Sequence, residues 1–585
     1  MSSVRPRVRI LFLLCLGAWL VVIGKMYYVQ VVVNDRYVAL ADRQHQRPAG
    51  GLFERGEVFL TTKDGEHVAA ATNRQGFVLY ISPKDITDPV GTYDALVGVL
   101  PDLNREDFIA RANKVGDPYE EVARRVTQDQ YEKIAALDKQ GVGFTREAWR
   151  FYPGESLAAH VVGFVSRGDD DRIVGRYGLE RKYEETLKRD EGEAFVNFFV
   201  ELFSGVKKAV TGEGRRGDVY TTIEPTVQAR AEDIAQGIAT KYSAKEVGVI
   251  VMDPRDGTIF AMASTPTYDP NVFNDVVDYG VYKNPLVENL YEMGSIIKPI
   301  TMAIGLDKEA VTPSSTFEDK GSLTLDGRTF YNFDKKVRGV VDMQAVLDNS
   351  LNTGVAYIVS RLGNQRFADS MRIFLGKETS VDLPSEAAPQ VENLKSPRSI
   401  EYATASFGQG IAITPIATIR ALAALGNGGV MVTPHVVSEV EYEGGSSEKF
   451  LAPDELPRAI SARASEDVTR MLVRVVDNAL LGGTMKKPDY AVAAKTGTAQ
   501  MSNPDGGYYE DKYLHSFFGY FPAYQPRFIV LIYAIDPRGE QYASHTLTEP
   551  FFELAEFLID YYSVPPDRPT EPEESQSTGT GGAVR

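Results

Sequence analysis

The order of three short motifs is the sequence feature that most constrains how this chain folds and what chemistry it carries. The motifs are Ser295-Ile-Ile-Lys298, then Ser350-Leu-Asn352, then Lys495-Thr-Gly-Thr498. Ser-X-X-Lys also occurs at Ser204 and at Ser446, so a lone match is close to chance expectation. Only Ser295 both precedes an apolar run typical of a helix, residues 299–306, and stands before the single Ser-X-Asn and the single Lys-Thr-Gly. This order predicts that distant segments converge on Ser295.

The first motif pairs a nucleophile with a base. A serine hydroxyl is a weak nucleophile near neutral pH and needs a base within hydrogen-bond reach. If Ser295 begins a helix, Lys298 lies on the same face and its amine can return to the serine oxygen. A lysine base must be partly deprotonated, which burial and a nearby positive charge favour, and Lys495 can supply that charge. We therefore predict that Ser295 is the nucleophile and Lys298 its base.

The other two motifs supply proton relay and substrate binding. We expect Ser350 to relay a proton to a leaving amine, and Asn352 to hold Lys298 or a substrate amide. The third motif follows residues 490–494, a predicted strand edge, where Gly497 would let a substrate backbone approach closely. We expect a substrate carboxylate to be bound by the other three residues of this motif, Lys495, Thr496 and Thr498. The backbone N–H groups of Ser295 and Thr498 are the expected oxyanion hole.

Each of these residues alone has an ordinary structural explanation. A lone serine at position 295 is typical of a helix cap, and Lys298 alone is typical of a solvated helix lysine. Ser350 and Asn352 resemble turn or capping residues, and Lys-Thr-Gly-Thr resembles a turn at the end of a strand. The prediction therefore rests on the three motifs together.

Size and composition exclude several classes of protein. With 585 residues, 43% of them hydrophobic, the chain can bury more than one core, and its length indicates about two to four domains. A formal net charge of -17 disfavours a nucleic-acid partner, which needs a concentrated excess of Lys and Arg. The histidines and the single cysteine, Cys15, show none of the spacings typical of metal sites. We expect no metal and no other cofactor.

The amino-terminal segment predicts the compartment. Three arginines precede residues 10–24, which carry no charge, and apolar residues continue to Val33. The segment is either a signal peptide or a membrane anchor, but residues 25–30 offer no small-residue cleavage site. Residues 10–33 reach the roughly 20 residues that span a bilayer. We expect an inner (cytoplasmic) membrane protein with a single span, residues 1–9 in the cytoplasm and the catalytic part extracytoplasmic.

The rest of the chain divides into three predicted regions. Residues 44–216 form a non-catalytic pedestal, or dimerisation-like, domain, residues 217–564 the catalytic domain, and residues 565–585 a tail too polar to pack. The predicted elements are strand 76–81, helix 129–137, a helix opened by Pro225, a hairpin of residues 247–253 and 258–263, strand 527–535 and helix 550–562.

At these motifs the chain resembles the penicillin-recognising serine enzymes, and among them it is similar to the class B penicillin-binding proteins. The resemblance covers roughly residues 55–562. Beyond the motifs it rests on Arg55–Val58, Asp64–Gly65, Tyr152–Glu155, Ala159–Phe164, Gly178–Tyr183, Ala263–Asn271, Tyr291–Ser295, Ser406–Gly410 and Lys495–Gln500. Ile296, Ile297 and Met293 depart from the residues common in the family, which bears on pocket shape rather than on catalysis.

The resemblance implies an α+β multidomain fold. Its parts are a single transmembrane helix, an elongated mixed α/β pedestal, and a transpeptidase domain whose mainly antiparallel sheet is sandwiched by helices. It also implies peptidoglycan D,D-transpeptidation. Ser295 would attack the D-Ala-D-Ala end of a stem peptide, release D-Ala and pass the acyl group to an amine of a neighbouring stem. Beta-lactams would acylate the same serine.

The family contains division and elongation enzymes. The short anchor, the lack of appended C-terminal modules and the segment 522–527 resemble the division type, which implies a polytopic membrane glycosyltransferase and other divisome proteins as partners. A beta-lactamase shares the motifs, but no Glu-X-X-X-Asn element stands between Ser350 and Lys495. A beta-lactam sensor and a non-catalytic divisome scaffold are further alternatives.

Overall fold

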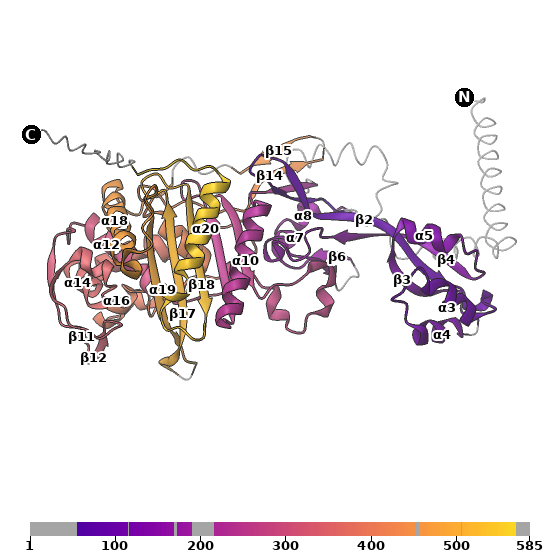
Figure 1. The fold of residues 1–585 in the computed structure, drawn as a ribbon, viewed down its shortest axis with the longest axis horizontal. Coiled ribbons are helices and arrows are strands. Elements are labelled where there is room, and N and C mark those ends of the chain that lie inside the picture. The colour runs from indigo at the N-terminus through magenta and orange to yellow at the C-terminus, as the bar shows by residue number, and fades with distance from the viewer. Residues whose placement is uncertain are drawn as a thin grey trace, which may run out of the picture. The chain divides into compact units, whose positions relative to one another are not determined.

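The computed structural model describes residues 55–114, 116–168, 172–189, 216–443, 445–450, 456–504 and 506–568 (Figure 1). By their contacts the described residues form two compact units. The smaller comprises 73–149, and the larger comprises 55–72, 150–189 and the described residues from 216 onward. Among the described residues, the chain passes from the larger unit to the smaller after residue 72 and returns after residue 149.

The smaller unit is a mixed α/β unit. Strand β2 (His67–Ile81) enters it and pairs antiparallel with β3 (Glu120–Val126) and also with β4 (Val142–Phe151). Its helical elements are η2 (Pro83–Asp85), α3 (Pro89–Val97), α4 (Arg105–Ala112) and α5 (Gln128–Ala135). Thr127 begins α5 with a capping box that its side chain forms with Gln130. The predicted strand 76–81 and the predicted helix near 129–137 are both confirmed.

The first sheet of the larger unit joins segments that are far apart in the sequence. Its strands are β1 (Val58–Thr61), β7 (Gly217–Thr221), β14 (Val437–Tyr442) and β15 (Ser447–Lys449), in the order β15-β14-β7-β1-β2. Strand β1 pairs parallel with β7 and antiparallel with the start of β2. Residues just before and just after the smaller unit therefore belong to the same body as the catalytic motifs.

A buried ion cluster joins three segments of the larger unit. Glu180, on α7 (Gly178–Lys182), accepts from Arg55 Nε and from Arg150 Nε, each at 2.6 Å. The carboxylate and both guanidinium side chains are at most 2% exposed. Glu184, on α8 (Glu184–Leu187), also pairs with Arg55 at 2.6 Å. Removing one partner of such a buried cluster leaves an uncompensated charge, which typically costs about 3–5 kcal/mol.

The central sheet of the larger unit is antiparallel throughout. Its strands are β8 (Glu246–Met252), β9 (Ile259–Thr265), β16 (Ala493–Ser502), β17 (Tyr508–Phe521) and β18 (Phe528–Ile535). They lie in the order β16-β17-β18-β8-β9, which makes β16 and β9 the edges. The predicted hairpin is β8 with β9, and the predicted buried strand is β18.

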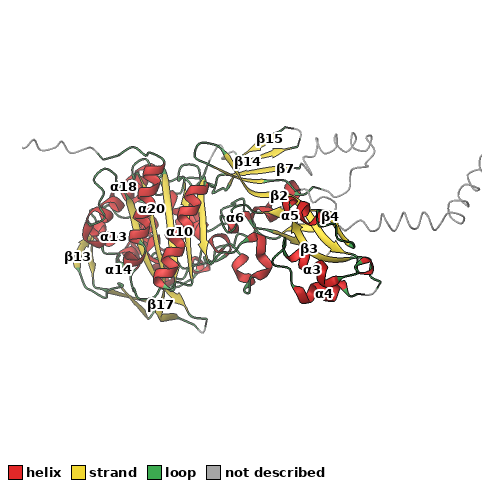
Figure 2. Cartoon of the chain, turned by 45° about the vertical axis from the view of Figure 1, so that its right-hand side comes forward, coloured by secondary structure: helices red, strands yellow, loops and turns green. Residues whose placement is uncertain are grey.

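Helices cover both faces of this sheet because side chains alternate along its strands. Val249, Val530 and Ile532 point to the face covered by α10 (Pro225–Tyr242) and α20 (Thr548–Tyr561). Their neighbours, such as Ile250 and Leu531, belong to the core on the opposite face. Figure 2 shows the strands of this sheet between the layer formed by α10 and α20 and the helices of the opposite face. The predicted antiparallel sheet sandwiched by helices is confirmed.

The second helical layer carries the first two motifs. It contains α12 (Lys298–Asp307), α13 (Met343–Asp348), α14 (Asn352–Leu362), α15 (Asn364–Leu375), α16 (Ser399–Ala405), α17 (Pro415–Ala423) and α18 (Ala462–Arg474). Two small antiparallel ribbons accompany it, β10 (Thr316–Asp319) with β13 (Gly339–Asp342), and β11 (Ser322–Leu325) with β12 (Arg328–Tyr331).

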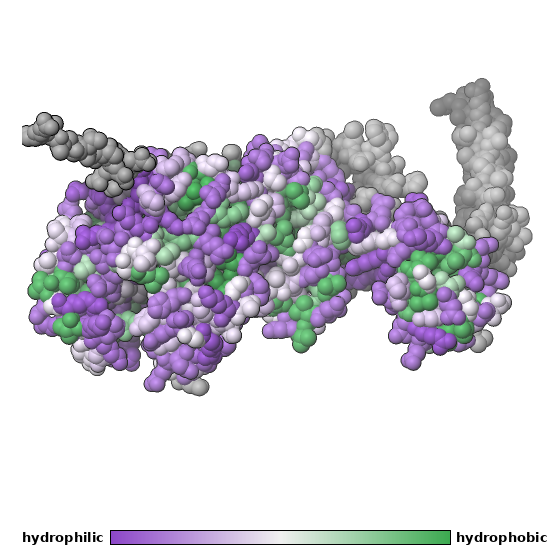
Figure 3. Space-filling model, in the orientation of Figure 1, coloured by the Kyte–Doolittle hydropathy of each residue, from purple (hydrophilic) through white to green (hydrophobic). Residues whose placement is uncertain are grey.

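Short elements complete the larger unit. They are α6 (Ala159–Val162), β5 (Val165–Arg167), β6 (Ile173–Gly175), η4 (Pro270–Asp275), η5 (Tyr279–Tyr282), α11 (Pro285–Glu288), η6 (Gly294–Ile297), η7 (Glu392–Lys395), η8 (Val475–Ala479), η9 (Leu480–Gly483) and α19 (Ala543–Thr546). Figure 3 shows one face of the molecule, where hydrophobic residues of the described part form separate patches among hydrophilic ones.

Two terminal predictions fall wholly or partly outside the described residues. The predicted anchor, residues 10–33, lies outside the described residues, within which no helix is long and apolar enough to cross a membrane. The predicted tail begins too early, because Asp567 Oδ1 accepts from Ala491 N at 2.7 Å and Arg568 pairs with Asp477 at 2.6 Å. The rest of that segment, residues 569–585, lies outside the described residues.

Candidate active site

The predicted nucleophile lies in a tight turn. Ser295 belongs to the 3-10 helix η6, which leads directly into α12, and its side chain is half-buried. Gly294 has a φ of 65°, and its N–H donates to Gly408 O at 3.2 Å. A Cβ atom on Gly408 would lie 2.3 Å from the carbonyl oxygen of Gly294, so only glycine fits there. The 406–410 segment therefore holds the turn from one side.

The central sheet holds the same turn from the other side. Ser516, on β17, donates its hydroxyl to Met293 O at 2.9 Å. Gly497, on β16, packs against this turn so closely that an added Cβ would lie 2.9 Å from Met293 O and 2.4 Å from Ser516 Oγ. Gly497 was expected to admit a substrate backbone. The close approach exists, but it is made by the turn that carries Ser295.

Lys298 is buried and contacts the second motif. It is 1% exposed, and its Nζ lies 3.0 Å from Ser350 Oγ and also donates to Ser350 O. Burial, and then the positive charge of Lys495, hold the pKa of Lys298 well below its usual range. The predicted bond to Ser295 is absent, because no described residue is a hydrogen-bond partner of the Ser295 hydroxyl. Such bonds often tighten only when substrate binds.

The second motif lies between two helices. Ser350 follows α13 and has a φ of 53°, a left-handed conformation that non-glycine residues seldom adopt. Asn352 begins α14, and its Nδ2 donates to Tyr331 O at 2.8 Å. Ser350 therefore stands where a relay is expected. In this structure Asn352 donates to the end of β12 and not to Lys298.

The third motif lies inside an edge strand. Lys495 was expected just after a strand, but it is the third residue of β16, which pairs with β17 alone among the described strands. The other edge can offer backbone groups to an extended peptide. Lys495 is 3% exposed, and burial lowers its pKa to about 8, although the charge of Asp348 acts in the opposite direction. Thr496 and Thr498 are half-buried, and Thr498 Oγ1 accepts from Ala543 N at 3.1 Å.

Asp348 is a site residue that sequence reasoning did not assign. Its Oδ1 accepts from Gln344 Nε2 at 2.8 Å. Burial raises the pKa of Asp348, while the nearby charges of Arg474 and Lys495 lower it. Its place two residues before Ser350 is the one signal in the sequence that could have found it.

The geometry supports acyl transfer through a serine. Lys298 bonds directly to Ser350, Gly497 packs on the turn that bears Ser295, and the charge of Lys495 helps to keep Lys298 neutral. A neutral amine beside a serine hydroxyl is a general base, and a hydroxyl beside that amine is a proton relay. Within the described residues, His, Cys, Asp and Glu side chains form no group that could hold a metal ion. The predicted oxyanion hole stays a prediction.

Comparison with known proteins identifies the family. Residues 247–555 match the model of the penicillin-binding protein transpeptidase domain, and residues 54–199 match the penicillin-binding protein dimerisation domain. The chain is a class B penicillin-binding protein. This pair of domains makes the penicillin-binding protein a serine-type D-Ala-D-Ala transpeptidase, as the three motifs predict.

Relatives match this penicillin-binding protein over most of its length. It is 30% identical to stage V sporulation protein D of Bacillus subtilis over 562 residues, 94% of this chain and 85% of that protein. It is 26% identical to peptidoglycan D,D-transpeptidase FtsI of Escherichia coli K12 over 582 residues, 96% of this chain and 93% of that protein.

Solved structures share the fold. Penicillin-binding protein 3 of Mycobacterium tuberculosis complexed with aztreonam matches with a TM-score of 0.66 and 24% identity, over 89% of this chain and 98% of that one. The apo form matches with a TM-score of 0.63 and 27% identity, over 72% and 93% of the two chains.

Proposed function

We propose that this penicillin-binding protein cross-links peptidoglycan stem peptides during septal wall synthesis, and that beta-lactams inhibit it through Ser295. The observation that carries the proposal is the buried Lys298 amine, with its lowered pKa and its 3.0 Å contact to Ser350 Oγ. With this contact, the three motifs would supply a nucleophile, a base and a relay.

Lys298 and Ser350 carry the proton in both half-reactions of this proposal. Lys298 takes the proton as Ser295 Oγ attacks the penultimate D-Ala carbonyl, and Ser350 passes that proton to the leaving nitrogen as the amide bond breaks. D-Ala departs, and the acyl group stays on Ser295 as an ester. An acceptor amine then attacks this ester, loses its proton to the same pair, and releases the serine hydroxyl. We expect Lys495 to bind the terminal carboxylate of the stem while its amine is charged.

The edge of β16 that pairs with no described strand supports a mode of substrate binding. An extended stem peptide can add to an edge strand through main-chain hydrogen bonds. This geometry would lay the scissile bond beside η6, because Gly497 on β16 already packs against Met293. Recognition would then combine backbone pairing with the charge of Lys495.

Acylation tests the proposal. The full chain is incubated with aztreonam or ampicillin, the ligands of the matched penicillin-binding protein 3 structures, and its intact mass is measured. We expect a stable adduct that Ser295→Ala abolishes. Ser446→Ala is the matched control, because Ser446 also heads a Ser-X-X-Lys pattern. No adduct on folded wild-type protein contradicts the proposal, and hydrolysed drug in the same sample would identify a beta-lactamase.

The membrane anchor and localisation belong to the same proposal. Residues 10–33 supply the apolar length, and the arginines before them favour a cytoplasmic amino terminus. Protease added to intact spheroplasts should digest the catalytic domain, and detergent should be needed to extract the full chain. A catalytic domain protected until the membrane is lysed contradicts this topology.

A septal role is favoured by the names of the relatives. Several are peptidoglycan D,D-transpeptidases named FtsI. A polytopic glycosyltransferase of the septal machinery and other divisome proteins are the proposed partners. Depletion of the protein should block septation and produce filaments. Rounded cells would point instead to elongation, and growth supported by Ser295→Ala would point to a scaffold role.

A further inference from the structure

Helix α14, which begins at the last residue of the second motif, lacks a cap of its own. It starts at Asn352, and the preceding residue, Leu351, has no side chain that can accept a hydrogen bond. The first N–H groups of a helix have no intrahelical acceptors, so a buried start without a cap is costly. The position of Ser350, two residues before the helix, depends on how this end is held.

A remote asparagine supplies the missing cap. Asn332 follows β12 and is 1% exposed, and its Oδ1 accepts from Thr353 N at 3.1 Å. Its neighbour Tyr331 accepts from Asn352 Nδ2 at 2.8 Å through the backbone carbonyl. Tyr331 and Asn332 therefore accept hydrogen bonds from Asn352 and Thr353, the first two residues of α14.

A buried carboxylate stands behind this cap. Asp319 is 0% exposed, and its Oδ1 accepts from Asn332 Nδ2 at 2.9 Å and from Thr353 Oγ1 at 2.8 Å. Gly321 N donates to the same oxygen at 3.0 Å. Among the described residues Asp319 has no cationic partner, and its Oδ2 has no hydrogen-bond partner. Burying a carboxylate without an opposite charge costs free energy, so stability alone does not account for it.

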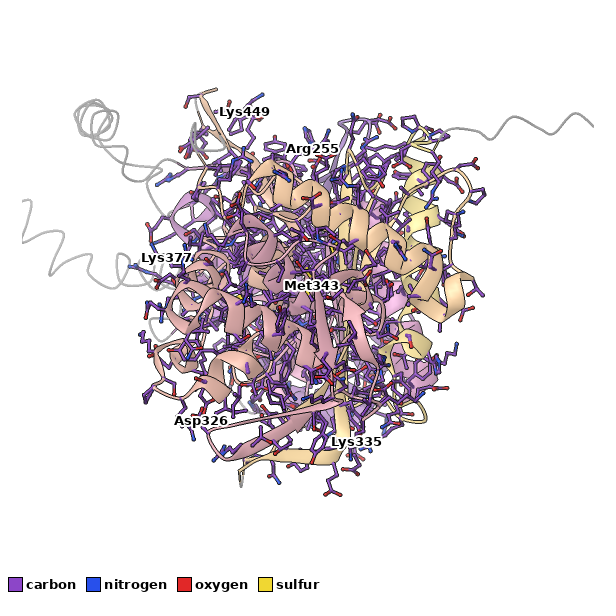
Figure 4. The ribbon with its side chains drawn as sticks, turned by 90° about the vertical axis from the view of Figure 1, so that its left-hand side faces the viewer. Arg255, Asp326, Lys335, Met343, Lys377 and Lys449 are labelled. Atoms are coloured by element: carbon purple, nitrogen blue, oxygen red, sulfur yellow. The ribbon has the colours of Figure 1, made fainter. Side chains whose placement is uncertain are left out.

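The ribbon that delivers Asn332 is itself anchored. Asp326, at the turn between β11 and β12, accepts from Ile400 N at 2.9 Å. Figure 4 shows Asp326 and Lys335 at the lower edge of the larger unit, and Met343, which begins α13, among the helices above them. Asn332 is therefore held both at the tip of its ribbon and at Asp319.

We propose that Asp319, Asn332 and Thr353 are positioning residues for catalysis, which set the start of α14 so that Ser350 meets Lys298. The left-handed backbone of Ser350, with φ 53°, persists only where its surroundings determine it. The cap fixes this backbone conformation through residues that do not contact Lys298. This inference rests on the acyl-transfer function proposed above.

Thr353 allows a matched test on the full chain. Thr353→Val removes the hydroxyl at nearly constant shape, and Thr353→Ser keeps it. We expect Thr353→Val to slow acylation by a fluorescent penicillin about 10- to 100-fold at a temperature where the protein is folded, and to shift the pH profile. Thr353→Ser should stay within about threefold of wild type. Thr418→Val is the control, because Thr418 is also buried and donates its hydroxyl to Thr414 O, at 2.9 Å, within its own helix.

Equal acylation rates for Thr353→Val and Thr418→Val would overturn the inference, since both then report stability alone. If Thr353→Val does not fold, Asp319→Asn decides. A rate lowered about tenfold or more supports positioning, and an unchanged rate refutes it. Wild-type protein that forms no adduct overturns the proposed function instead. In that case a crystal structure of Asp319→Asn decides the positioning claim, which fails if the contact between Lys298 and Ser350 stays at 3.0 Å.

Discussion

The amine of Lys298 lies 3.0 Å from the hydroxyl of Ser350, although 52 residues separate them in the chain. The contact joins a base to a relay, so the first and second motifs act as one proton-transfer unit. Lys298 is also buried, and this burial is the main cause of its lowered pKa. The following predictions test the parts of this unit.

Removing the relay should slow acylation without unfolding the protein. Ser350→Ala deletes the hydroxyl beside Lys298 but keeps the backbone that also accepts from the amine. We expect the second-order rate constant with a fluorescent penicillin to fall about a hundredfold or more. Ser360→Ala is the control, because Ser360, on α14, donates its hydroxyl to Tyr357 O, at 2.7 Å. Equal rates for the two variants would remove Ser350 from the proton path.

Acylation should show a bell-shaped pH profile. The rate rises as Lys298 loses its proton, through a pKa that burial and the charge of Lys495 hold well below 10.5. It falls again as Lys495, with a pKa of about 8, loses the charge that binds the substrate carboxylate. Asp348→Asn removes the carboxylate that raises the pKa of Lys495, so the falling limb should move to lower pH. Asp369→Asn, an exposed change on α15, should leave both limbs in place.

Two buried histidines should make the fold acid-sensitive. Burial lowers the pKa of His160 and of His515 from 6.5 to about 4. The unfolded chain therefore takes up protons first, so stability is fully present above pH 6.5 and is lost as the pH falls toward 4. Each histidine contributes a loss of roughly 3 kcal/mol at the lower limit.

Thermal melts between about pH 7.5 and pH 4.5 test this linkage. His515 contacts Thr546 Oγ1 at 2.8 Å and Gln541 O at 3.1 Å, contacts that a neutral ring makes. His515→Gln should lower the melting temperature at neutral pH but make its decline with acid shallower. A decline as steep as that of wild type would show that His515 does not titrate in this window.

Gly497 should tolerate no side chain. Gly497→Ala places Cβ 2.4 Å from Ser516 Oγ and 2.9 Å from Met293 O, and so pushes β16 away from the nucleophile turn. We expect loss of acylation together with a lower melting temperature. Gly237→Ala is the control, because nothing lies within 4 Å of its Cβ position on α10. That variant should be more stable by up to about 1 kcal/mol, with normal acylation. Normal acylation in Gly497→Ala would contradict the packing argument.

Local pattern was enough to predict the main elements of the catalytic unit. Pro225 opens α10, and apolar alternation or runs mark β8, β9 and β18. The three motifs also meet as their order predicts. What could not be read from the sequence depends on long-range packing. The partner of Asn352 lies at Tyr331, and the neighbours of Gly497 are Met293 and Ser516, because folding brings separate segments together.

The ion cluster in the larger unit can form only late in the synthesis of this part of the chain. Arg55 and Glu180 stand 125 residues apart, and the described part of the smaller unit, 73–149, is made between them. Domains generally fold as units while the chain emerges. A nascent chain that ends between residues 150 and 180 therefore contains the described part of the smaller unit, while Arg55 and Arg150 still lack the carboxylate that joins them. A ribosome that stalls in this interval would carry a chain in which the smaller unit can fold while the ion cluster of the larger unit is still incomplete.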